Sequence, residues 1–297
     1  MAKRGGATLV DTLIVCGIVG SLLALALPAL QRARGAADRT ACQNQMRQIG
    51  QALHMYHNDY GRLGNGGGFR PESANRHLSW LATLLPYIEE NALYHRAKQT
   101  AQAAENVQDL LQHQGMQTVV RLYVCPTDAR LRAVHTDAWG TTAALVSYIG
   151  SRGVVGSDMR ALSGAIPGVK LEEVIDGAST TIAMGERPPP DSFQAGWWYP
   201  NINYHHVGFR GPHLSLFVGE TSMFLGGGGI DCRVTLRATG PGRTSNPCDR
   251  FHFWSLHGGG SNFLFVDGSV RFLSYSADPI LPALISINGG EPVTVPD

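Results

Sequence analysis

The feature that most constrains this chain is an apolar run near its start, over residues 12–30. Within the run only Thr12 and Ser21 carry clearly polar side chains. These 19 residues are close to the roughly 20 that cross the hydrocarbon core of a membrane as a helix. The run is too long for the apolar part of a cleaved secretory signal. The pattern therefore predicts a transmembrane helix that covers residues 7–30.

A second pattern predicts that this helix continues as an amphipathic helix over residues 31–60. Five apolar residues recur at spacings of four and three, which places them on one helix face: Cys42, Met46, Ile49, Leu53 and Tyr56. Pro28 and Gly35 are expected to kink or loosen the joint between the two halves. The sequence Asn-Asp-Tyr-Gly at 58–61 predicts the helix end.

Composition and short apolar runs predict an α+β globular head over residues 61–297. The whole chain is 43% apolar and 16% charged, as in a globular protein, and its net charge of +1 gives no nucleic-acid footprint. Helices are expected at 81–98 and 101–114, and a short strand that ends in a turn at 121–128. From about residue 140, apolar runs alternate with Gly, Pro, Asn and Asp, which is typical of β structure.

The clearest local signal in the head is a β-hairpin over residues 262–273. Two β-rich runs flank the dipeptide Asp267-Gly268. Asp-Gly between two such runs is a strong hairpin signal. We expect Asp267 and Gly268 to take the positive-φ positions of a type I′ turn.

The five cysteines form no Cys-x-x-Cys pair, so a zinc ribbon or a thioredoxin-like motif has no support. Cys16 lies inside the apolar run and is expected to be a small buried apolar residue. Cys232 and Cys248 lie close together in a loop-rich region. They can form a disulfide if this region lies outside the cytoplasm; the alternative is two unpaired thiols.

The acidic residue at the front of the apolar run needs a separate explanation. Basic residues, a glycine, then Thr-Leu-Val-Asp at 8–11 and an apolar helix resemble the class III leader of prepilins and type II secretion pseudopilins. In that family a membrane prepilin peptidase cuts after the glycine on the cytoplasmic face, and the new N-terminus is methylated. The resemblance implies a leader peptide over residues 1–6, cleavage between Gly6 and Ala7, and Asp11 as the fifth mature residue.

The resemblance also implies a role for Asp11 in assembly. A carboxylate in lipid costs roughly 2.5–3.5 kcal/mol at a helix centre, and less near the interface. In a filament, Asp11 would pair with the N-terminal amine of a neighbouring subunit. The alternative is an interfacial residue that caps the helix. The chain departs from the family at two positions, with Ala7 where Phe is usual and Asp11 where Glu is usual.

A second resemblance covers nearly the whole chain. His257, nine further residues and Asp267-Gly268 resemble the C-terminal signature of a bacterial prepilin-like family of unknown biochemical activity, sometimes labelled solute-binding. Other segments match this family in order: Cys42-Gln43-Asn44, 85–89, 125–128, and 176–181 followed by Gly185-Glu186.

No motif predicts an enzyme or a metal site. Glu186, His252, His257 and Asp267 are residue types that can bind metals, but their spacing matches no zinc pattern. We expect His257 to hydrogen-bond and fix the Gly-rich entry to the hairpin. Calcium is a weak alternative, because loop aspartates at 158, 176 and 231 could supply oxygen ligands.

The resemblances together imply a type IV pilin-like fold, with the long N-terminal helix packed on an antiparallel sheet. They imply a single-pass inner-membrane subunit of a type II secretion or type IV pilus-like filament. Its N-terminus would be cytoplasmic, its head periplasmic or extracellular, and its partners other pilin-like subunits. The alternative is a membrane-tethered extracytoplasmic binding module for a solute, glycan or protein, which would use the loop 197–206 with its His205-His206 pair. This aromatic loop is equally compatible with a buried flap.

Overall fold

The computed structural model describes most of the chain, in eleven segments. These are residues 9–64, 78–104, 114–137, 140–155, 168–193, 196–199, 203–204, 208–209, 213–214, 237–290 and 293–296. The described chain divides into two compact units, residues 1–40 and residues 41–297. We call the second unit the head.

The first helix, α1, spans Leu9–Tyr60 and is 52 residues long. It is unbroken at Pro28 and Gly35, so the expected loosening at these positions does not interrupt the helix. The helix ends as predicted: Gly61 has a φ of 68°, in the left-handed region, and its N–H donates to the carbonyl of His57 at 2.6 Å.

The part of α1 in the first unit is apolar and exposed. Among the described residues, α1 is the helix long and apolar enough to cross a membrane. Its apolar side chains include Leu13, Ile18 and Leu30, which are 63%, 56% and 67% exposed. A surface of this kind needs an apolar environment other than the head.

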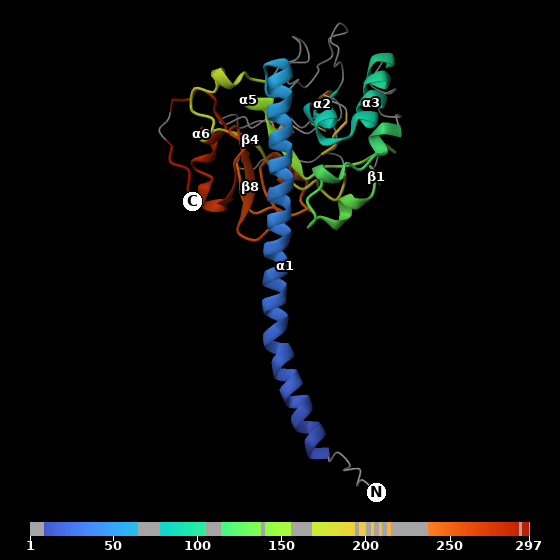
Figure 1. Ribbon diagram of the computed structural model, residues 1–297, viewed down its shortest axis with the longest axis vertical. Coiled ribbons are helices and arrows are strands. Elements are labelled where there is room, and N and C mark those ends of the chain that lie inside the picture. Colours follow the sequence, from blue (N-terminus) through green and yellow to red (C-terminus); the bar gives the residue numbers. More distant parts are fainter. Residues whose placement is uncertain are drawn as a thin grey trace. The chain divides into compact units, whose positions relative to one another are not determined.

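The head is built on a five-stranded sheet with the order β7-β3-β4-β8-β9. Two of its neighbouring strands, β4 and β8, are labelled in Figure 1. Its strands are β3 (Tyr148–Ser151), β4 (Ile182–Glu186), β7 (His213–Leu214), β8 (Gly260–Phe265) and β9 (Val270–Ser274). All neighbouring pairs are antiparallel except β3 and β7. The fold is therefore α+β with a pilin-like layout, as the sequence predicted.

Two short pairs of strands and several short helices complete the described part of the head. The pairs are β1 (His135–Thr136) with β2 (Thr142–Ala143), and β5 (Asn203–Tyr204) with β6 (Gly208–Phe209). The α-helices are α2 (Trp80–Leu84), α3 (Asn91–Ala103), α5 (Arg152–Val155) and α6 (Leu281–Ile285). The 3-10 helices are η1 (Leu85–Ile88), η2 (Gln114–Gln117), η3 (Arg121–Tyr123), η4 (Ala129–Arg132), η5 (Leu171–Glu173), η6 (Pro247–Phe251) and η7 (Tyr275–Ala277).

The two faces of the sheet pack against different partners. On the α1 side, the stripe predicted from the sequence is fully or almost fully buried. The helix lies so close to β8 that a Cβ added at Gly50 would be 2.8 Å from Leu264 Cδ1. The other face packs Phe263 and Phe265 with Leu281 and Leu284 of α6. This alternation along β8 follows the two-residue period of a strand.

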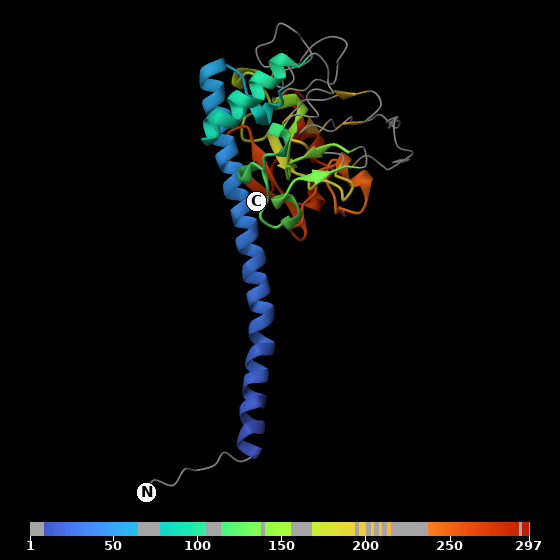
Figure 2. The same cartoon turned by 90° about the vertical axis from the view of Figure 1, so that its right-hand side faces the viewer.

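The helical segment from α2 to α3 differs from the single helix expected at 81–98. It lies beside the end of α1 in both views (Figures 1 and 2), where the Tyr87 hydroxyl donates to Asp59 Oδ2 at 2.5 Å. Pro86 lacks the backbone donor of a regular helix, and Glu89 has a φ of 65°, so the segment turns between α2 and α3. Of the helix expected at 101–114, residues 101–103 form the end of α3, which stops at Ala103, and residues 105–113 lie outside the described residues.

The prediction at 121–128 is wrong for the strand and confirmed for the turn, where Asp128 N donates to the Cys125 carbonyl at 2.9 Å. Residues 121–123 form η3, in which local bonds run from Tyr123 N to the Val120 carbonyl and from Val124 N to the Arg121 carbonyl. The segment carries a strand-like apolar pattern because most of its apolar side chains are buried in the head. The Tyr123 side chain is fully buried, and its hydroxyl donates to the Leu81 carbonyl at 2.8 Å.

The turn between β8 and β9 differs from the expected type I′ turn. Gly268 has a φ of 85°, but Asp267 is not among the described non-glycine residues with positive φ. Gly268 N donates to the Phe265 carbonyl, and Phe265 N donates to the Ser269 carbonyl. The connection is therefore a three-residue loop that ends in a left-handed glycine. Asp267 instead accepts a bond from Ser269 N with its carboxylate, at 2.8 Å.

Candidate functional site: a buried cluster beside a disulfide

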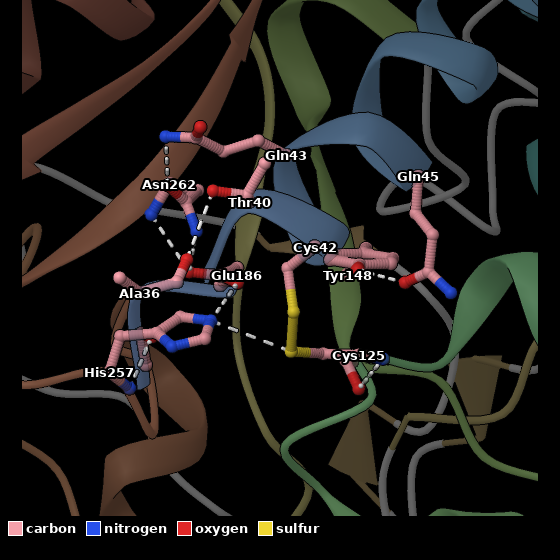
Figure 3. Close-up of polar contacts among 12 residues, drawn as sticks. Ala36, Thr40, Cys42, Gln43, Gln45, Cys125, Tyr148, Glu186, His257 and Asn262 are labelled. Atoms are coloured by element: carbon pink, nitrogen blue, oxygen red, sulfur yellow. Dashed lines mark hydrogen bonds and ion pairs between the residues drawn. A yellow bond between two sulfur atoms is a disulfide. The ribbon is translucent and has the colours of Figure 1, made fainter. Parts of the chain in front are cut away.

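The most concentrated set of chemically capable side chains in the described head lies between α1 and the sheet (Figure 3). It contains Cys42 on α1, Cys125 after η3, Glu186 at the end of β4 and His257 before β8. All four are buried, and their ligand-type atoms lie within 4.8 Å of one another. Cys42 and Cys125 form a disulfide, with Cα atoms 5.2 Å apart. We call this set the disulfide cluster.

The two carboxylate oxygens of Glu186 have different environments. Its Oε2 accepts bonds from the backbone N–H and the Nδ2 of Asn262, at 2.8 and 3.1 Å. Its Oε1 is buried, accepts no hydrogen bond and lies 3.4 Å from His257 Nε2. The residue is 2% exposed. A buried carboxylate needs such partners, because burial without them is costly.

His257 directs one ring nitrogen at two groups. Its Nε2 lies 3.4 Å from Glu186 Oε1 and 3.6 Å from Cys125 Sγ. Because the same nitrogen makes both contacts, the imidazole is not arranged to relay a proton between the carboxylate and the sulfur. Its backbone N–H donates to Ser255 Oγ at 2.9 Å, which fixes the start of the glycine-rich entry to β8.

Polar contacts from α1 position this cluster. Gln43 Nε2 donates to Asn262 Oδ1 at 3.0 Å, so α1 holds the side chain that holds Glu186. The Tyr148 hydroxyl donates to Gln45 Oε1 at 2.7 Å (Figure 3). Burial, and to a lesser extent the charge of Glu186, raises the pKa of Tyr148 well above its ordinary value. The phenol therefore stays neutral and remains a donor.

Arg187, the next residue along the chain, has a different environment. It is buried, and its Nη1 donates to the carbonyl of Arg250 at 2.8 Å. Burial, with a contribution from the charge of Arg250, lowers the pKa of Arg187. Among the described residues no carboxylate forms an ion pair with it. Glu186 and Arg187 are therefore adjacent and both buried, but they form no ion pair with each other.

Comparison with known protein families assigns the chain to one of them. Residues 31–280 match the model of a family described as proteins of unknown function, DUF1559. The chain belongs to the DUF1559 family. No curated protein and no solved structure matches it significantly. Membership of DUF1559, together with the apolar half of α1, fits a membrane-anchored module with its head outside the cytoplasm.

The disulfide of this DUF1559 head was missed by sequence reasoning, which placed Cys42 in an apolar stripe and in a family-matching segment but proposed no partner for it. Its partner lies 83 residues away, and spacing does not reveal such pairs. The available signal was that both cysteines open short matching segments, Cys42-Gln43-Asn44 and 125–128.

The other cysteine predictions have different outcomes. Cys248 is disulfide-bonded, but Cys232 lies outside the described residues, so their pairing stays a prediction. Cys16 is exposed on α1, contrary to the expectation that the apolar run would bury it within the protein.

The remaining predicted site residues that the structure describes are not members of the disulfide cluster. Asp11 is exposed in the first turn of α1. Asp267 and Gly268 form the hairpin turn. His252 is half-buried, and this partial burial is the main cause that lowers its pKa. Gly6 and Ala7 lie outside the described residues.

Of the three loop aspartates proposed as calcium ligands, the structure describes Asp176, so a shared calcium site stays a prediction. Asp176 accepts bonds from the backbone N–H groups of Gly289 and Gly290, at 2.7 and 2.9 Å. These bonds lower the pKa of Asp176, and its carboxylate thereby fixes the C-terminal segment. Asp158 and Asp231 lie outside the described residues.

The aromatic loop proposed as a binding surface is buried where it is described. Trp197, Trp198 and Tyr199 are each 1% exposed. Trp198 Nε1 donates to the Thr118 carbonyl at 2.9 Å, and the Tyr199 hydroxyl donates to the Ala97 carbonyl at 2.9 Å. These residues belong to the core. His205 and His206 lie outside the described residues.

Proposed function

We propose that this protein is a membrane-anchored, pilin-like subunit that assembles into a filament through the apolar half of α1. The observation that carries the proposal is the change of environment along one helix. Apolar side chains are exposed from Leu9 to Leu30, whereas the stripe from Cys42 to Tyr56 is buried in the head. Lipid would cover the exposed half before assembly, and copies of the same helix would cover it in the filament.

Asp11 would give this assembly its register. It lies in the first turn of α1, where the helix dipole favours an anion. Cleavage between Gly6 and Ala7 would create an amine four residues before it. Pairing of Asp11 with the Ala7 amine of a neighbouring subunit would compensate the cost of a carboxylate near lipid.

The disulfide supports a head outside the cytoplasm, because disulfides persist mainly in oxidising compartments. We therefore propose an inner-membrane protein with a cytoplasmic N-terminus and a periplasmic or extracellular head. A prepilin peptidase would process it, in a type II secretion or type IV pilus-like system.

The processing step is tested by the mature N-terminus. We expect mass spectrometry of the native protein to find a chain that begins at Ala7, with a methylated amine. A chain that still begins at Met1 or Ala2, in a cell with an active prepilin peptidase, would contradict the proposal.

The assembly step is tested by Asp11→Ala. The variant should insert into the membrane normally but form at least about tenfold less filament, since a lost pairing worth 1.4 kcal/mol changes an equilibrium tenfold. Filament yield is measured by shearing and electron microscopy, with membrane-bound protein as the reference. Asp11→Glu keeps the charge and is expected to assemble. Equal filament yield from Asp11→Ala would exclude the pairing.

The alternative, a monomeric tethered binding module, predicts no filament from the wild-type chain and head binding that is unaffected by Asp11→Ala. The burial of residues 197–199 removes part of the surface on which this alternative relied.

A further inference from the structure

We propose that the disulfide cluster is also a zinc site: once the Cys42–Cys125 bond is reduced, Cys42, Cys125, Glu186 and His257 bind one zinc ion. The inference does not depend on filament assembly, because every residue in it belongs to the head.

The first support is the set of distances around His257 Nε2. Zinc binds His nitrogen at about 2.0–2.1 Å, carboxylate oxygen at about 2.0–2.2 Å and thiolate sulfur at about 2.3 Å, in a tetrahedron. From these bond lengths, nitrogen and oxygen ligands lie about 3.4 Å apart, and nitrogen and sulfur about 3.6 Å apart. The corresponding distances here are 3.4 Å to Glu186 Oε1 and 3.6 Å to Cys125 Sγ.

These distances fit zinc ligands better than they fit hydrogen bonds. An N–H···O bond usually spans about 2.9–3.0 Å, so the contact between His257 and Glu186 is long for one. Glu186 Oε1 accepts no hydrogen bond although it is buried. A cation at the centre of the cluster would satisfy this oxygen, the imidazole nitrogen and both sulfurs together.

The groups around the cluster are those that orient metal ligands. Asn262 holds Glu186 Oε2 and leaves Oε1 directed inward (Figure 3). Ser255 fixes the backbone of His257, and Ser147 Oγ accepts a bond from Cys125 N at 2.9 Å. Such second contacts set the direction and affinity of ligands in metal sites.

The two sulfurs are the one part of the geometry that must change. Two thiolates on one zinc lie about 3.8 Å apart, whereas a disulfide holds its sulfurs about 2 Å apart. The bonded pair therefore excludes the ion. Two electrons and two protons convert the disulfide to two thiols, with a protein dithiol as the reductant in the cell. Zinc then displaces the two thiol protons.

Under this proposal, both the oxidised and the zinc-bound cluster would connect α1 to the segment after η3. The disulfide joins α1 to the segment after η3 covalently, and the zinc ion would join them by coordination. A head exported with reduced cysteines could thus hold α1 in place before the disulfide forms.

The experiment compares oxidised and reduced full-length protein in detergent, freed of metal with a chelator. Reduction uses a phosphine, which takes the oxygen of water as it becomes a phosphine oxide and leaves Cys42 and Cys125 as thiols. It also reduces the disulfide of Cys248, so the variants at the cluster below identify which thiols bind the metal. Cobalt(II) serves as the spectroscopic probe and zinc as its competitor. We expect the reduced chain to bind about one cobalt with a thiolate-to-cobalt charge-transfer band. We expect the oxidised chain to give no such band.

Variants distinguish the proposed zinc ligands from residues that do not bind the ion. His257→Gln should lose the cobalt spectrum, and Asn262→Ala should weaken zinc binding by about 10–100-fold, as loss of a supporting contact does. His252→Gln is the matched control, because His252 is a half-buried histidine outside the cluster, and the variant should bind zinc normally. Near-ultraviolet circular dichroism establishes that each reduced chain is folded.

Two results would overturn the inference. One is a reduced, folded wild-type chain that gives no charge-transfer band. The other is undiminished binding by folded His257→Gln. If that variant does not fold, the wild-type comparison and Asn262→Ala still decide, and zinc bound equally by oxidised and reduced protein would reject the site.

Discussion

The two halves of α1 have the same secondary structure and opposite relations to their surroundings. Between Leu9 and Leu30 nearly every side chain is apolar and exposed, whereas between Cys42 and Tyr56 the apolar residues form one buried stripe. The first half has no polar face, which is what a helix surrounded by lipid on all sides would require. The second half has one because the head covers a single side. Equivalent substitutions in the two halves should therefore have unequal effects on the head.

The largest difference in the stability of the head is expected between substitutions of the two cysteines of α1. Cys42→Ala removes a disulfide that closes a loop of 83 residues, which should lower the free energy of unfolding by about 4–5 kcal/mol in the oxidised protein. Cys16→Ala should leave it unchanged, since Cys16 is exposed and outside the head. Denaturant unfolding in detergent, followed by tryptophan fluorescence, measures both. Equal effects of the two variants would refute the contrast.

A smaller difference is expected between two isoleucines. Ile49 is fully buried, so Ile49→Ala should destabilise the head by about 3 kcal/mol through lost burial and a residual cavity. Ile18 is 56% exposed, and Ile18→Ala should leave head unfolding unchanged. The same unfolding assay applies. Loss of head stability in Ile18→Ala would show that the halves are not independent.

The smallest difference in stability is expected between two glycines of α1, where substitution by alanine should have opposite effects. At Gly50 an added Cβ would lie 2.8 Å from Leu264 Cδ1, so Gly50→Ala should cost about 1–2 kcal/mol of head stability. At Gly35 an added Cβ meets nothing within 4 Å, and alanine should favour the helix locally by up to about 1 kcal/mol. Hydrogen exchange along α1 and head unfolding report the two changes. Stabilisation by Gly50→Ala would contradict the close packing.

Periodicity predicted the parts of the fold that depend on one face of one element. The stripe on α1 and the helix end at Gly61 could be read directly, because burial at i, i+3 and i+4 leaves a signal within a few residues. Residues 121–128 gave a strand-like pattern for another reason. Tyr123 is apolar and buried because of the tertiary structure, although its local hydrogen bonds are those of a 3-10 turn.

The disulfide cluster could be predicted only in part. The sequence marked Glu186 and His257 as candidate residues, but it gave no reason to join them to Cys42 and Cys125. The four come from α1, the segment after η3, β4 and the residues before β8, and only the tertiary fold brings them together. The turn at Asp267 illustrates the same limit on a smaller scale. Asp-Gly indicates a hairpin, whereas loop length depends on the strand register.

The Cys42–Cys125 bond also determines how the protein would carry tension. Cys42 is the second residue of the head, counted from the anchor, so a pull between the anchor and the C-terminus passes across the disulfide almost at once. The residues between the two cysteines then bear no load and cannot extend. After reduction, tension that unfolds the head could extend this segment by roughly 290 Å, at about 3.5 Å for each of the 83 residues. The bond makes the head a short, stiff link rather than an extensible one.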